Sequence, residues 1–107
     1  MVVTVTTSKT PVYASPARAG RFVIGVGAFT PDSAELSKRT VGTSFVVVDD
    51  PSGARHEAGD LIQAGMDWTA VASMVEALTG ELEITAPVLL KTVGCAAWDL
   101  ASCHVAK

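Results

Sequence analysis

Hydroxyl groups and glycines dominate the residues of this sequence that could contact a ligand. They lie in four short segments: Thr6-Thr7-Ser8-Lys9, Gly25-Val26-Gly27-Ala28-Phe29, Asp49-Asp50 and Lys91-Thr92-Val93-Gly94. Glycine allows a backbone to approach a ligand closely, and free amides at the start of a helix attract anions or polar groups. These four segments are therefore the candidate ligand-binding positions.

Each segment also has a purely structural interpretation. Thr6, Thr7 and Ser8 are ordinary turn formers, and Gly25 and Gly27 are compatible with a tight turn. For the remaining charged residues, we expect Lys91 to be solvated at a strand end and Asp49-Asp50 to cap a helix.

The histidines give no support for acid–base or metal chemistry. His56 and Asp60 have i, i+4 spacing, but the second histidine of an HExxH motif is absent, so we expect a solvated or interfacial helix face. His104 lies in a mostly apolar stretch and is expected to be packed or to cap a helix. No Ser-His-Asp or Cys-His arrangement can be assembled, so we assign no catalytic residue and no metal ligand.

Apolar or β-branched runs that predict strands precede the four segments. The runs are Val2–Thr6, Phe22–Val26, Ser44–Asp49 and Pro87–Lys91. Nearly continuous runs are typical of buried parallel strands, whereas antiparallel strands with one wet face alternate with charged residues. In a parallel sheet, ligands bind outside the carboxyl ends of the strands, which is where these segments fall.

Four stretches predict helices between and after the strands. They run from Asp32 or Ser33 to Arg39, from Asp50-Pro51 through a turn or helix that includes His56–Ala64, over Trp68–Thr79, and over Cys95–Ala106. Asp67 is expected to cap the third and Gly80 to end it, while Gly94 opens the last. Strands that alternate with helices predict an α/β fold with a parallel sheet and right-handed crossovers.

Composition excludes several classes of protein. The 107 residues are 49% hydrophobic and 18% charged, with a net charge of −3. This is enough apolar material for a core, and it provides no electrostatic footprint for nucleic acid or an anionic membrane. No apolar run approaches the roughly 18 residues that a membrane span needs, and Met1–Thr7 is not a signal peptide, so we expect a cytoplasmic protein. Cys95 and Cys103 lie too far apart on one helix to pair, and we expect reduced thiols.

The phosphate-binding fingerprint of a dinucleotide domain is missing. Gly25-x-Gly27 is followed by Ala28, Phe29 and Thr30, which breaks the GxGxxG pattern. The pyrophosphate site of a Rossmann domain is therefore not expected within these residues.

Four stretches together resemble the ornithine cyclodeaminase / mu-crystallin family of nicotinamide-dependent enzymes. They are VTVTTSKTPV (3–12), GVGAFTPDSAEL (25–36), VVVDDPSGARHEAGDL (46–61) and LLKTVGCAAWDLA (89–101). The resemblance implies that residues 1–107 are the C-terminal half of an NAD(P)-binding Rossmann-like domain, a partial parallel sheet flanked by helices and lacking the first strands. The substrate domain and the phosphate loop of the family would lie elsewhere.

The resemblance also implies roles for individual residues. Thr6, Thr7 and Ser8 match the loop that borders the cofactor. Val26, Gly27 and Ala28 match the loop beside the nicotinamide ribose and amide. Val93 and Gly94 match a turn near the nicotinamide, where Val93 also faces the substrate.

Phe29 departs from the ornithine cyclodeaminases, which have an aspartate at this position. Phenylalanine cannot accept a proton or pair with an ammonium group. The stretch around it instead resembles bacterial reductases of cyclic ketimines, Δ1-pyrroline-2-carboxylate and Δ1-piperideine-2-carboxylate, in which Phe29 would be an apolar wall for the ring of the substrate.

Three hypotheses follow. The first is part of an NAD(P)H-dependent reductase that converts a cyclic imino acid to proline or pipecolate, with ornithine cyclodeaminase and alanine dehydrogenase as alternatives. The second is a non-catalytic fragment, because the phosphate loop is missing, so that this chain alone is not expected to bind NAD(P)H tightly. An opening strand and an uncapped last helix also suit an excised piece. The third is an assembly module, a possible homodimer in which Val2–Thr6 pairs with its copy.

Overall fold

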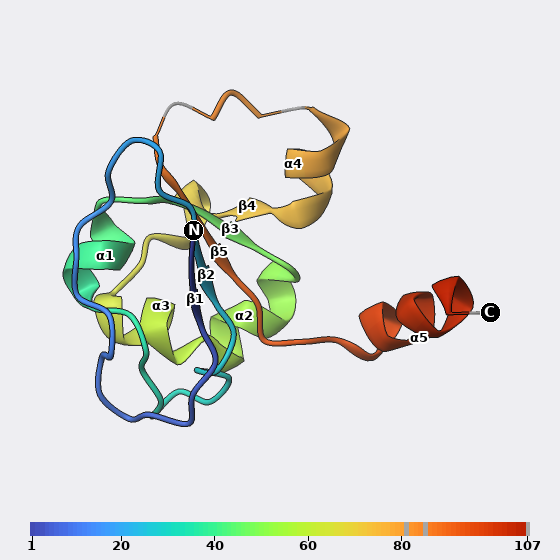
Figure 1. The fold of residues 1–107 in the computed structure, drawn as a ribbon, viewed down its shortest axis with the longest axis horizontal. Coiled ribbons are helices and arrows are strands. Elements are labelled where there is room, and N and C mark those ends of the chain that lie inside the picture. Colours follow the sequence, from blue (N-terminus) through green and yellow to red (C-terminus); the bar gives the residue numbers. More distant parts are fainter. Residues whose placement is uncertain (81, 85, 107) are drawn as a thin grey trace.

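The computed structural model describes residues 1–80, 82–84 and 86–106, and at its centre lies a five-stranded sheet (Figure 1). The strands are β1 (Val2–Thr4), β2 (Val23–Gly25), β3 (Phe45–Val48), β4 (Ala72–Ser73) and β5 (Val88–Lys91). Their order across the sheet is β1-β2-β5-β3-β4, and every neighbouring pair is parallel. The predicted α/β class with a parallel sheet is confirmed, and each predicted strand contains an observed one.

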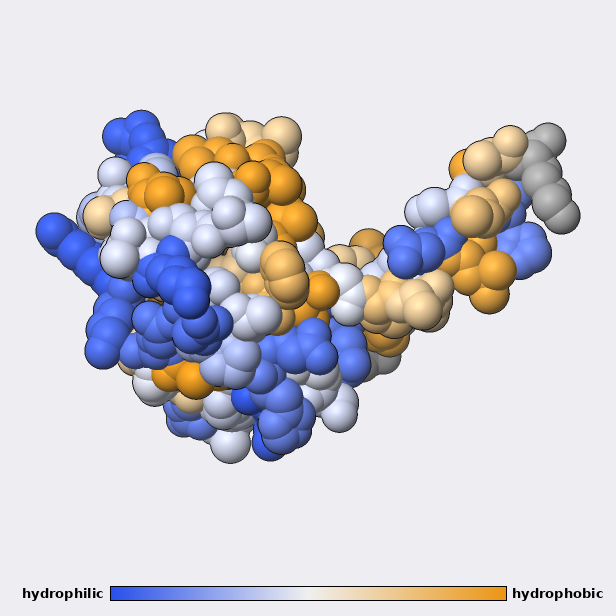
Figure 2. Space-filling view, turned by 90° about the horizontal axis from the view of Figure 1, so that it is seen from below, coloured by the Kyte–Doolittle hydropathy of each residue, from blue (hydrophilic) through white to orange (hydrophobic). Residues whose placement is uncertain are grey.

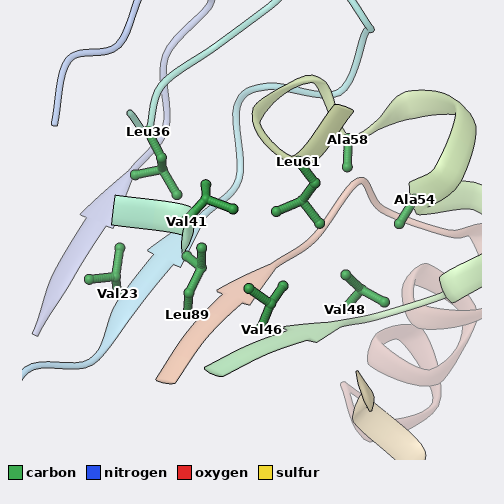
Figure 3. Packing of buried hydrophobic residues seen from close by; sticks show 9 residues of the cluster. All are labelled: Val23, Leu36, Val41, Val46, Val48, Ala54, Ala58, Leu61 and Leu89. Atoms are coloured by element: carbon green, nitrogen blue, oxygen red, sulfur yellow. The ribbon is translucent and has the colours of Figure 1, made fainter. Parts of the chain in front are cut away.

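One face of the sheet carries the main hydrophobic core. Three short helices cover this face: α1 (Lys38–Gly42), α2 (Pro51–Glu57) and α3 (Gly59–Ala64). Figure 3 shows strand residues Val23, Val46, Val48 and Leu89 beneath Leu36, Val41, Ala54, Ala58 and Leu61. All nine are at most 2% exposed, so their removal from water is the main force that holds the helices on the sheet.

The opposite face of the sheet is only partly covered. Helix α4 (Met74–Thr79) lies there, apart from the three helices of the other layer (Figure 1). An apolar hollow of about 250 Å3 lies between this helix and the sheet. Its lining residues are Phe22, Val47, Met74, Ala77, Leu78, Ile84, Val88 and Leu90.

The predicted cap at Asp50 is confirmed. Its carboxylate accepts hydrogen bonds from the amides of Ser52 and Gly53, and Pro51 occupies the first helical position, where no amide donor is needed. The stretch predicted after it forms two helices rather than one, because the chain leaves helical geometry at Ala58.

The helix predicted from Asp32 or Ser33 to Arg39 is wrong. The only helix in that region is α1, which begins at Lys38 and is capped by Ser37. The amides of Glu35 and Leu36 donate instead to Oδ1 of Asp60, 2.6 and 2.8 Å away. A buried acceptor from α3 therefore replaces the local bonds that a helix would need.

The single helix predicted over Trp68–Thr79 is also wrong. Residues Trp68–Ala70 form one 3-10 turn, Ala72–Ser73 form β4, and only Met74–Thr79 are α-helical. Strand β4 pairs with Val47 and Val48 of β3, so sheet pairing overrides the helical spacing. The predicted stop at Gly80 is confirmed, with the left-handed backbone (φ 77°) that favours glycine.

The last helix, α5 (Ala96–Val105), projects from the body of the protein (Figures 1 and 2). Every one of its residues is exposed, including Trp98, Leu100 and His104, so the expectation of a packed His104 is wrong. Within the described residues, Cys95 and Cys103 are free thiols, as predicted. No helix among them has the length and apolar character to cross a bilayer.

Candidate functional site

The four candidate segments follow the carboxyl ends of β1, β2, β3 and β5, at one edge of the sheet. Backbone hydrogen bonds continue the sheet into this edge. The amide of Val26 donates to Thr4 O at 2.9 Å, and the amide of Thr92 donates to Gly25 O at 3.0 Å. The strands thus bring together loops that are up to 88 residues apart, from Thr6 to Gly94.

The loops after β1 and β2 line a shallow hollow of about 520 Å3 that is open to solvent. It is lined by Val5, Thr6, Thr7, Val26, Gly27 and Phe29. The structure therefore groups most of the residues predicted in the first two segments, and it places the half-exposed Phe29 at their rim.

Other predicted residues lie outside this hollow. The side chain of Ala28 is fully buried, and the Ser8 hydroxyl donates to Thr10 O at 2.6 Å within its own loop. Val93 and Gly94 lie at the end of β5 and do not line the hollow, although β5 is the direct neighbour of β2.

Gly27 is required by the protein chain itself rather than by a ligand. A Cβ atom at this position would lie closer than 3.0 Å to Thr6 O, to Thr6 N and to the Glu35 carboxylate. Because this space is already filled, the glycine lets the loops after β1 and β2 lie against each other.

Glu35 is the residue that holds these two loops, and the sequence interpretation missed it. Its side chain is fully buried. One carboxylate oxygen accepts from the Thr6 amide, and the other accepts from the Gly27 amide at 2.6 Å and from the Thr4 hydroxyl at 3.0 Å. Burial alone would raise the pKa of Glu35, but the hydrogen bonds from Thr6, Gly27 and Thr4 outweigh burial and lower it.

Asp49 does the same for the loop after β5. It is 4% exposed, and its carboxylate accepts from the Thr92 hydroxyl and from the amides of Val93 and Gly94, at 3.1 and 3.0 Å for the amides. Asp49 and Asp50 are therefore not an acid–base pair: Asp50 caps α2, and Asp49 ties that strand end to the neighbouring one.

Lys91 is buried, which contradicts the expectation that it is solvated. Its side chain is 0% exposed, and its ammonium group donates to Gly25 O at 3.2 Å and to Thr92 O at 2.8 Å. The same nitrogen lies 3.9 Å from Oδ2 of Asp60, which is equally buried. The expectation of a solvated helix face is therefore also wrong for Asp60.

Burial opposes both charges of this pair. It lowers the pKa of Lys91, against the attraction of Asp60, Glu35 and Asp49, and it raises the pKa of Asp60, against the bonds from Leu36 and Glu35 and the charge of Lys91. Within the described residues, Oδ2 of Asp60 has no hydrogen-bond donor, so the Lys91 ammonium is its electrostatic partner.

A sequence signal for Lys91 did exist. Side chains two apart on a strand share a face, and Leu89 belongs to the core, so Lys91 had to point inward beside it. Glu35 and Asp60 have no comparable local signal, because their partners, apart from Gly27 eight residues before Glu35, lie 24 to 31 residues away along the chain.

The site can therefore orient a ligand but is poorly suited to bind an anion. The amides of Thr6, Gly27, Val93 and Gly94 already donate to buried carboxylates, so they do not form the free donor cradle that a phosphate needs. Within residues 1–80, 82–84 and 86–106, no group of three or more His, Cys, Asp or Glu side chains could hold a metal ion.

Comparison with known proteins confirms the resemblance noted in the sequence. The chain is 62% identical over all 107 residues to Δ1-pyrroline-2-carboxylate reductase 2 of Burkholderia ambifaria, of which it covers 34%. No family model matches. The chain thus spans about a third of the length of this relative.

Two solved structures share the fold. A probable ornithine cyclodeaminase from Bordetella pertussis superposes with a TM-score of 0.72, and the Δ1-pyrroline-2-carboxylate reductase of Thermococcus litoralis, solved with NADH and L-proline, superposes with a TM-score of 0.75. Each match has 28% identity and covers 87% of this chain, but only 33% and 32% of the other chain, respectively.

Proposed function

We propose that residues 1–107 form the C-terminal half of an NAD(P)-binding domain and supply the nicotinamide side of the cofactor site in a cyclic imino acid reductase. The observation that carries this proposal is identity of 62% over the whole chain to a Δ1-pyrroline-2-carboxylate reductase. The substrate is accordingly Δ1-pyrroline-2-carboxylate, or its six-membered homologue Δ1-piperideine-2-carboxylate, and the product is proline or pipecolate.

The residues at the carboxyl edge fit the uncharged end of a dinucleotide. The hollow between Thr6 and Phe29 has mainly apolar walls, and buried carboxylates occupy the neighbouring amides. When bound, the reduced nicotinamide supplies the hydride, and the protein has to orient the ring and exclude water. In this proposal the shared hollow supports Thr6, Thr7, Val26 and Gly27 as the border of that ring, and Val93 and Gly94 would approach it from the end of β5.

Phe29 suits an imino acid ring better than an amino acid side chain with a charged end. It is 52% exposed at the rim of the hollow, where an apolar surface can pack against methylene groups of a ring. It offers no acceptor for an ammonium group, which counts against ornithine as substrate.

A chimera tests the proposal. The corresponding third of the Burkholderia ambifaria reductase is replaced by residues 1–107, and oxidation of NADH and NADPH is measured with Δ1-pyrroline-2-carboxylate. We expect imine-dependent oxidation within about tenfold of the parent reductase, because conservative exchange within a packed domain preserves the site. A folded chimera that binds NAD(P)H but reduces no imine would contradict the proposal.

The isolated chain gives the complementary result. We expect no measurable NADPH oxidation with Δ1-piperideine-2-carboxylate, since the chain has no GxGxxG unit to hold the pyrophosphate. Robust turnover by pure 107-residue protein would contradict the assignment of only half a cofactor domain to it.

Self-association through β1 is a separate proposal. This strand lies at the edge of the described sheet, and Val3 and Val5 are 48% and 68% exposed. Exposed edge strands pair readily with copies of themselves. Size-exclusion chromatography with light scattering should detect a dimer that Val3→Lys dissociates; a clean monomer at high concentration would contradict it.

A further inference from the structure

We propose that Glu35 is a positioning residue for the cofactor site, because its one buried carboxylate sets the spacing between the loops after β1 and β2. This inference rests on the proposed function for its catalytic consequence, but its structural part does not. Glu35 is not among the residues that line the hollow. It therefore acts through the residues that form the walls.

The carboxylate joins two separate loops. Thr4 and Thr6 come from the end of β1, and Gly27 comes from the end of β2. Thr6 and Gly27 are both walls of the hollow. A single rigid group that accepts from both walls fixes the distance between them, which neither loop can do alone.

The backbone of Glu35 is itself held by hydrogen bonds, so the position of its side chain is fixed. Its amide donates to Asp60 Oδ1 at 2.6 Å, and its carbonyl accepts from the amides of Val12 and Tyr13 at 2.8 and 2.9 Å. The position of the loops is thus set from α3 through Asp60, and from residues 12–13, to the rim of the site.

The charge of Glu35 matters as well as its shape. Hydrogen bonds from a backbone N–H group to a carboxylate are roughly twice as strong as those to a neutral acceptor. Glutamine presents one oxygen and one NH2 group, so it can accept from only one of the two sides and must set N–H against N–H on the other. Glu35→Gln should therefore release either the Thr6 loop or the Gly27 loop while the core remains intact.

Amide exchange measured by NMR on the 107-residue chain tests the structural part. In Glu35→Gln we expect the exchange rate of the Thr6 or the Gly27 amide to rise about tenfold or more, while the core amide of Leu89 keeps its rate. Glu57→Gln is the matched control, because Glu57 is exposed at the end of α2. Unchanged exchange at both amides in a folded Glu35→Gln protein would overturn the inference.

The unaltered chain provides a second measurement that does not depend on a variant that folds. The proton shifts of the Thr6 and Gly27 amides should follow the titration of the Glu35 carboxyl carbon as the pH falls. Asp60 accepts a hydrogen bond from the Glu35 amide, and Lys91 lies 3.9 Å from Asp60, so the side chains of Asp60 and Lys91 are followed in the same series. Amides that track Asp60, or that do not move with Glu35, would overturn the inference.

The chimera tests the catalytic part. Glu35→Gln should raise the KM for the nicotinamide cofactor about tenfold and alter the KM for the imine less, whereas a merely structural role would lower the melting temperature without changing this ratio. An unchanged cofactor KM in a folded variant would overturn positioning. If the unaltered chimera is inactive, the proposed function fails, and the NMR experiments still decide whether Glu35 sets the loops.

Discussion

Replacing Lys91 by methionine tests the buried charges beneath the site. Methionine keeps an unbranched apolar stem but removes the ammonium group. The carboxylate of Asp60, which is 1% exposed, then loses the cation 3.9 Å from its Oδ2 atom. Breaking a buried ion pair by removing one partner costs about 3–5 kcal/mol. This is a large part of the free energy of unfolding of a small domain.

The cost in free energy of unfolding has an upper limit that depends on pH, because Asp60 can take up a proton instead. For a carboxyl with an unfolded pKa of about 3.9, protonation at pH 7 costs about 4 kcal/mol, at roughly 1.4 kcal/mol per pH unit. At pH 5 the same step costs only about 1.5 kcal/mol. We therefore expect Lys91→Met to lose about 3–4 kcal/mol at pH 7 and roughly 1.5 kcal/mol at pH 5.

The sign follows from the direction of the pKa shift. Burial already raises the pKa of Asp60 in the folded protein, and loss of Lys91 raises it further. A folded state with a raised pKa binds the proton more tightly than the unfolded state. Its contribution to stability is therefore complete below the unfolded pKa and is lost as the pH rises through the folded pKa.

Urea denaturation of both proteins at pH 5, 6 and 7 measures the effect. Lys38→Met is the matched control, since Lys38 is exposed on α1 and its replacement should change stability by less than about 0.5 kcal/mol. In Lys91→Met/Asp60→Asn, the retained oxygen still accepts from the amides of Glu35 and Leu36 while the charge is gone. The double variant should therefore be more stable at pH 7 than Lys91→Met alone.

Equal losses at pH 5 and pH 7 would refute this reasoning, because the Asp60 carboxylate would then not carry the cost. A loss no larger than that of Lys38→Met would refute the burial of the ammonium group itself.

Three further predictions concern local structure. Gly27→Ala should lower the free energy of unfolding in urea by about 1–3 kcal/mol, because the added Cβ meets the Thr6 backbone. Gly42→Ala, whose added Cβ meets nothing within 4 Å, should instead stabilise α1 by up to about 1 kcal/mol. The opposite order of stabilities would contradict the close approach of the loops. Asp50→Ala should cost about 1 kcal/mol through loss of the α2 cap, and an unchanged urea midpoint would count against the cap. Hydrogen exchange should show α5 opening well before β5, because a ten-residue helix without burial is marginal in water; equal protection would mean that α5 is packed in solution.

The elements that the sequence predicted correctly are those whose signal is local. The strands follow from continuous apolar runs, the start of α2 from Asp50-Pro51, and the end of α4 from Gly80. Each of these signals acts within a few residues of its own position, so no knowledge of the tertiary fold is needed to interpret it.

The features that the sequence did not predict depend on partners far along the chain. Helical spacing over Trp68–Thr79 gave way to β4 because Ala72 and Ser73 meet β3. A helix was expected over the stretch that contains Glu35, and a solvated or interfacial helix face was expected for Asp60. Only the fold shows that each accepts hydrogen bonds from buried amides. The position of the loops was predictable from the strands, whereas the carboxylates that hold the loops were not.

These carboxylates also bear on which part of a dinucleotide this edge of the sheet suits. A phosphate needs free amide donors and tolerates no nearby negative charge, but Glu35 and Asp49 supply negative charge and occupy the amides of Thr6, Gly27, Val93 and Gly94. A reduced nicotinamide ring carries no negative charge of its own and needs walls rather than an anion cradle. Under the proposed function, an edge built from buried carboxylates therefore favours the ring, and residues outside this edge would hold the phosphates.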